Sequence, residues 1–79
     1  MADKLCPILA GVAAEFGTAI PEAAPAQLVI RVAGTYDYDP DALDAVLDGA
    51  DAATAAACPA DRAAVLDATG KASLTEAMR

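Results

Sequence analysis

The first part of the chain repeats its apolar residues at the spacing of an α-helix. Between residues 1 and 17 the large apolar side chains recur three or four positions apart, and small or charged residues separate them. Because an α-helix turns once every 3.6 residues, this spacing places them on one face. The pattern predicts a helix that Gly17 ends, with an apolar face formed by Leu5, Ile8, Leu9, Val12 and Phe16.

A second segment is bounded by helix signals. Residues 25–34 begin with Pro25, at the position that proline favours in a first helical turn, and they end at Gly34. Their centre, residues 28–32, has the β-branched composition of a strand, but no second such stretch in the sequence could pair with it. We therefore expect a helix there.

A third helix has the clearest start. Asp39 is suited to cap it, Pro40 to be its first residue, and Asp41 and Asp44 lie near the positive end of its dipole. Gly49 is expected to end or kink this helix. The residues predicted to face the core are Leu43, Val46 and Leu47.

The last part of the chain predicts further short helices. Residues 50–58 are mostly alanine, which suits a helix that packs closely against its neighbours. Pro59 begins another helix, which Gly70 ends. Ser73 and Glu76 form a capping box that starts a final short helix.

Composition supports the same fold. The 79 residues are 57% hydrophobic and rich in alanine, the best helix former. We predict an all-α fold, a single small domain over residues 1–79 with four to five short helices.

The N-terminal part is similar to a signal peptide, but Asp3 and Glu15 interrupt it, and residues 1–4 could replace a removed leader. No apolar run approaches the roughly 20 residues of a membrane-spanning helix, so membrane insertion is not expected.

The charge of the chain restricts its partners. The formal net charge is −7, and the five bases, Lys4, Arg31, Arg62, Lys71 and Arg79, form no basic stripe. Nucleic-acid binding is not expected, because affinity for nucleic acid depends on neutralising phosphates. A protein partner of this chain would be basic.

The two cysteines occur in matching contexts. Cys6 and Cys58 each precede a proline, Pro7 or Pro59, that we expect at a helix start. A disulfide between them would close a loop of about 50 residues and stabilise the fold by roughly 4 kcal/mol. The alternatives are two buried free cysteines or a reactive thiol at a helix N-terminus. The disulfide is favoured because short exported chains are commonly cross-linked, and it predicts a periplasmic or secreted protein.

The sequence lacks the residues that several kinds of catalysis require. The sequence has no histidine, which excludes Ser-His-Asp and Cys-His catalysis as these are usually built. Two distant cysteines do not make a zinc site, and the isolated glycines form no phosphate-binding loop. Ser73 is the only serine, and its capping role explains it. We expect no catalytic residue, no cofactor and no metal, and therefore a protein that is not an enzyme.

An acidic segment permits two interpretations. Asp37, Asp39, Asp41 and Asp48 occupy positions 1, 3, 5 and 12 of a calcium-binding loop, but Ala42 stands where that loop needs glycine. A capped helix start explains the same acids and is favoured.

Two tyrosines alternate with two of these acids. Tyr36 and Tyr38 could cover the edge of the core, or they could form with Asp37 and Asp39 an exposed contact surface for a partner.

The spacing of the cysteines and the order of the helices together resemble the layout of a known family. Cys6 and Cys58 lie about fifty residues apart, a helix starts in "PDALDAVLD" at 40–48, and "ADAATAAAC" at 50–58 runs into the second cysteine. In this layout residues 6–68 resemble the HdeA family of periplasmic acid-stress chaperones. The resemblance implies a small all-α domain with a disulfide between these cysteines, which forms a dimer that loosens in acid and exposes apolar surface to client proteins.

Two functional hypotheses follow. The first is a small exported binding protein that is chaperone-like. The second is an inhibitor-type or immunity-type interaction domain whose acidic face binds a basic protein.

Overall fold

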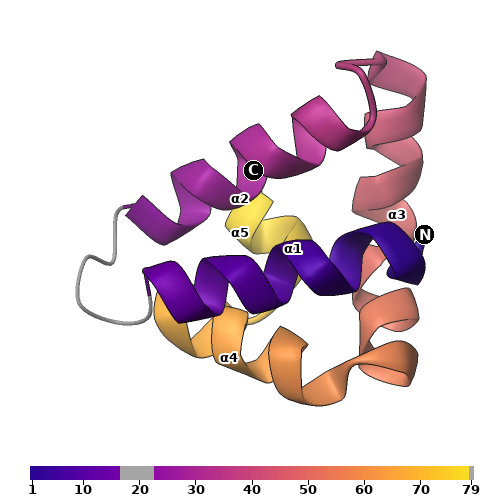
Figure 1. Ribbon diagram of the computed structural model, residues 1–79. Coiled ribbons are helices and arrows are strands. Elements are labelled where there is room, and N and C mark those ends of the chain that lie inside the picture. Colours follow the sequence, from indigo (N-terminus) through magenta and orange to yellow (C-terminus); the bar gives the residue numbers. More distant parts are fainter. Residues whose placement is uncertain (17–22, 79) are drawn as a thin grey trace.

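Five α-helices make up the described part of the protein (Figure 1). A computed structural model describes residues 1–16 and 23–78, and these contain no strand. The all-α prediction is confirmed, and the strand-like residues 28–32 are helical. Gly17 lies outside the described residues. The helices are α1 (Ala2–Glu15), α2 (Ala23–Thr35), α3 (Pro40–Ala57), α4 (Pro59–Thr69) and α5 (Leu74–Met78).

Helix α1 passes between α2 and α4, and α3 lies across its N-terminal end (Figure 1). The short α5 contacts α2, α3 and α4. Apolar faces of all five helices meet in one core, which confirms the predicted face of α1. The buried apolar side chains are Leu5, Leu9, Val12, Ala24, Leu28, Val32, Val46, Ala50, Val65, Ala68, Leu74 and Ala77.

Helix α1 begins earlier than the proline signal predicts. The carbonyl of Met1 accepts from the N–H of Leu5 at 3.0 Å, so Pro7 lies within the helix and not at its start. Proline cannot donate the bond that would reach the carbonyl of Asp3. The helix tolerates this loss because Leu5, Leu9 and Val12 on its apolar face are fully buried against the other helices.

Helix α2 also extends beyond its predicted limits of 25–34. It ends in a Schellman motif, in which the N–H of Tyr38 donates to the carbonyl of Ala33 at 2.9 Å and that of Asp37 to Gly34 at 3.2 Å. The left-handed position of this motif is normally glycine, but here Asp37 occupies it with φ 56°. Gly34 is therefore the second-last residue of the helix and does not end it.

Helix α3 starts as predicted but does not break at Gly49. The Asp39 side chain accepts from the N–H of Asp41 at 3.0 Å, and Pro40 is the first helical residue. The helix continues to Ala57 because Val46 and Ala50, on either side of Gly49, are buried in the core, and this packing outweighs the low helix propensity of glycine. A Cβ at Gly49 would lie 3.1 Å from the Met1 Cε atom, so this glycine makes room for close packing of α1 against α3.

Cys58 forms the corner between α3 and α4. It caps the end of α3 and the start of α4, and it is bonded to Cys6 of α1 with the two Cα atoms 6.0 Å apart. The disulfide prediction is confirmed, and the two free-thiol alternatives are wrong. Pro59 begins α4 as expected.

The last two helix boundaries follow the predicted signals. Gly70 ends α4 in the left-handed conformation with φ 70°. The Ser73 hydroxyl then accepts from the N–H of Glu76 at 3.1 Å and caps α5.

Candidate functional site

The predicted tyrosine contact surface divides between core and solvent. Tyr36 is half-buried, packs against the core, and has the ammonium of Lys4 5.1 Å from its ring centre. Burial raises the pKa of Tyr36, and the negative charge of Asp3 raises it further. Tyr38 is 68% exposed and has an unusual φ of 57°. Of the two tyrosines, Tyr38 alone is available to a partner.

The acids of the calcium-like pattern are not brought together. Asp37 lies in the α2–α3 turn, Asp39 caps α3, and Asp48 lies about 13 Å further along the helix axis. Within the described ranges, no group of three or more His, Cys, Asp or Glu side chains is arranged to hold a metal ion. The capped-helix interpretation accounts for the positions of Asp39 and Asp41.

An apolar groove opens between α2 and α3, and one residue of α5 also lines it. Its volume is about 110 Å³. This is smaller than the engineered cavity of about 150 Å³ that admits benzene, so it suits one large apolar side chain. The groove, hereafter the α2–α3 groove, is lined by Val29, Val32, Ala33, Leu43, Val46, Leu47 and Met78.

Apolar surface continues from this groove onto α2. Val29 is 40% exposed and Ile30 is 54% exposed. Sequence analysis predicted a helix here without assigning either side chain to a face. Apolar residues at 28, 29, 30 and 32 are too many for one face of that helix. That surplus was the available signal for an exposed apolar surface.

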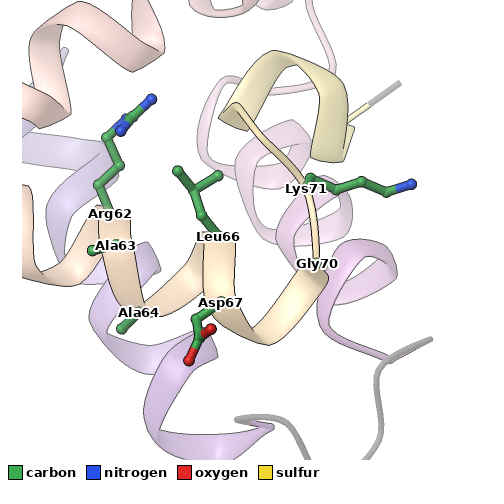
Figure 2. Close-up of a pocket in the computed structure, with 7 residues that line it drawn as sticks. All are labelled: Arg62, Ala63, Ala64, Leu66, Asp67, Gly70 and Lys71. Atoms are coloured by element: carbon green, nitrogen blue, oxygen red, sulfur yellow. The ribbon is translucent and has the colours of Figure 1, made fainter.

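A broad depression of about 720 Å³ lies along the outer side of α4 (Figure 2). Figure 2 shows that the charged ends of Arg62, Asp67 and Lys71 point in different directions and do not converge on one point. One helix and the turn after it supply all the lining residues. The charged groups of this depression are therefore not arranged to bind a small ligand together.

A polar junction joins the last three helices. The Asp51 carboxylate of α3 accepts from the Arg62 guanidinium of α4 at 2.8 Å and from the N–H of Leu74 at 2.8 Å. The N–H of Thr75 donates to it at 3.3 Å. Partial burial raises the pKa of Asp51, but these hydrogen bonds outweigh burial and hold the pKa below its usual value. Asp51 therefore caps α5 from another helix.

A second ion pair joins α1 to α2. The Arg31 guanidinium donates two hydrogen bonds, of 2.8 and 3.0 Å, to the Glu15 carboxylate. A Cβ at Gly11 would lie 3.1 Å from Arg31, so the glycine leaves room for the pair. The hydrogen bonds from Arg31 lower the pKa of Glu15, and the same pair raises the pKa of Arg31.

Comparison with protein-family models, with curated proteins and with solved structures finds no match for this chain. In the described ranges, no helix is both long and apolar enough to span a membrane.

Proposed function

We propose that this chain is a non-enzymatic protein-binding domain that recognises a basic protein in the periplasm or the extracellular space. The acidic face of α3 is the observation that carries the proposal. Asp41, Asp44 and Asp48 are exposed there, and none forms an ion pair with a base in residues 1–16 and 23–78. Unpaired charge of one sign beside exposed apolar side chains favours a partner of opposite charge.

The disulfide supports the proposed location of the protein in the periplasm or the extracellular space. Disulfides persist in oxidising compartments, whereas cytosolic thiols are generally kept reduced. The Cys6–Cys58 bond is thus consistent with an exported protein.

Site-specific photo-crosslinking in the producing cell tests the proposal. A photoreactive phenylalanine analogue at Ile30 or Tyr38, both exposed, should give a discrete product containing a basic protein. The same analogue at exposed Ala64, on the outer side of α4, is the matched control and should give none. Absence of a discrete product, or the same products from all three positions, would contradict the proposal.

An acid-responsive chaperone is a second candidate, and the Asp51 junction favours it. Protonation of this carboxylate weakens contacts that hold α4 and α5 to α3, and α5 contributes the buried Leu74 and Ala77 to the apolar core. We expect such a chaperone to suppress aggregation of a client enzyme at about pH 2, where carboxylates are protonated. Sedimentation at neutral and acid pH would test the accompanying homodimer. A monomer that stays folded and inert in acid would exclude this candidate.

A further inference from the structure

We propose that the α2–α3 groove is the docking site for an amphipathic helix of the basic partner. The helix would place one large apolar side chain in the groove and its basic residues against the acids of α3. This inference rests on the proposed function and goes further, because it names the surface and the kind of segment that the surface takes.

The groove has the apolar character of an anchor site. Its lining from α2 and α3 consists of aliphatic side chains, and Met78 of α5 adds a flexible thioether. Flexible methionines adapt to differently shaped apolar partners. A volume of about 110 Å³ suits a single buried side chain, and in protein complexes a few such anchors carry most of the binding energy.

Exposed apolar area beside the groove extends the contact. Val29 lines the groove and is 40% exposed, and Ile30, the next residue of α2, is 54% exposed. A partner helix offers apolar side chains three or four residues apart, so a second apolar residue could cover Ile30 while the first occupies the groove.

The opposite edge of the groove is acidic. Asp44 and Asp48 directly follow the lining residues Leu43 and Leu47, and each helical residue turns the side chain by about 100°. Both carboxylates therefore lie outward of the apolar lining on α3. Within α2, α3 and α5 the only base is Arg31, which is bound to Glu15.

This charge distribution selects the occupant. A second copy of the chain would bring another net charge of −7 and would place its own acidic edge near Asp44 and Asp48. Like charges at an interface oppose association, whereas lysine or arginine beside an apolar anchor satisfies both features of the groove. The complementary segment is therefore a cationic amphipathic helix.

Two synthetic peptides of identical composition test this inference. The first contains about 15 residues, with leucine every three or four positions and lysine between, so that it forms an amphipathic helix. The second is a scrambled isomer without helical period. Each is titrated into the protein while the methyl NMR signals of Val29, Val32, Leu43, Leu47 and Met78 are followed. Only the first peptide should shift these signals.

Matched variants separate the apolar and the charged contributions. Ala33→Leu fills the groove and should weaken binding of the amphipathic peptide about tenfold, whereas Ala64→Leu on the outer side of α4 should not. If Ala33→Leu fails to fold, Val29→Gln at the partly exposed edge replaces it. Asp44→Asn/Asp48→Asn should weaken binding at low salt by about threefold or more.

The control for charge is Asp61→Asn/Asp67→Asn on α4, which changes the net charge equally and should weaken binding less. Equal binding of both peptides, with methyl shifts that are not confined to the groove, would overturn the groove as the docking site but leave a basic partner possible. Failure of both peptides to bind, with a crosslinked partner still found, would place the docking site elsewhere. Methyl shifts that depend on protein concentration alone would identify a second copy as the occupant and overturn the inference. Loss of both peptide binding and crosslinking would reject the proposed function as well.

Discussion

The two sides of the molecule are held together by different means. On one side, α1 is bonded covalently to the α3–α4 corner through Cys6 and Cys58. On the other side, α2 and α5 meet α3 through noncovalent contacts, around a groove and next to a turn with two left-handed residues. This small domain therefore concentrates its cross-link in one half and leaves its adaptable surface in the other.

Removal of the disulfide from the cross-linked side should have the largest effect on the free energy of unfolding. Cys6→Ala/Cys58→Ala opens a loop with a sequence separation of 52 residues. The free energy of unfolding should fall by about 4 kcal/mol, because the unfolded chain regains loop-closure entropy. Urea unfolding followed by circular dichroism measures this. The stability of so small a domain is itself only several kcal/mol, so the variant should be close to unfolding at 25 °C. A loss below about 1 kcal/mol would show that packing alone holds the cross-linked side.

Replacement of Asp51 should have the next largest effect, on the α5 contacts. Asp51→Ala removes the acceptor of the Arg62 guanidinium and of the Leu74 N–H, and should cost about 2 kcal/mol. Asp48→Ala, one turn earlier and exposed, is the matched control and should change stability by about 0.5 kcal/mol or less. Hydrogen exchange should show faster exchange in α5 for the first variant only. Equal effects of the two variants would mean that the junction is not a structural contact.

Acid should remove part of the contribution that Asp51 makes to the free energy of unfolding. The pKa of Asp51 is lower in the folded protein, so its contribution is present above the unfolded-state value near 3.9 and is lost as the pH falls through the lowered folded-state pKa. The stability of the wild-type protein should therefore fall below about pH 4 more steeply than that of Asp51→Asn. Denaturant midpoints measured at several pH values test this. Parallel pH profiles would assign the acid sensitivity to other carboxylates.

Relief of the strained turn should stabilise the groove side modestly. Asp37 has φ 56° at a position that favours glycine, so Asp37→Gly should raise the free energy of unfolding by about 1 kcal/mol. Asp61→Gly in the first turn of α4 is the control and should destabilise the protein, because its position is helical. Thermal unfolding of both variants provides the measurement. A destabilising Asp37→Gly would indicate that the carboxylate itself holds the turn.

The smallest change is expected for the exposed ion pair that links α1 to α2. Glu15→Gln should leave the unfolding midpoint nearly unchanged, because exposed pairs are screened by solvent and lose side-chain entropy when they form. A double-mutant cycle with Arg31→Gln gives the coupling between the two residues. A coupling as large as that of Asp51 with Arg62 would remove the distinction between the two ion pairs.

Local signals in the sequence were sufficient for most of the fold. The cap at Asp39, the prolines at 40 and 59 and the stop at Gly70 act on neighbouring residues, so reading them in order located the starts of α3 and α4 and the end of α4. The matching contexts of Cys6 and Cys58 indicated their pairing.

Features that depend on distant contacts could not be read in this way. Nothing around Asp51 distinguishes it from the other aspartates of α3, since its partners lie 11 to 24 residues away. Gly49 remains helical because tertiary packing outweighs its low helix propensity. Pro7 is tolerated within α1 for the same reason. The groove depends on how α2, α3 and α5 are placed around it, which no local pattern specifies.

The position of the disulfide also determines how the chain responds to mechanical force. If residues 2 and 78 are pulled apart, tension passes from Cys6 directly to Cys58 and then through α4 and α5. Helix α2 and nearly all of α3 lie within the closed loop and bear no tension along the backbone. A protease that unfolds its substrates by pulling at the residue 78 end would therefore unfold α5 and α4 first. The closed loop would then resist further unfolding until the disulfide was reduced.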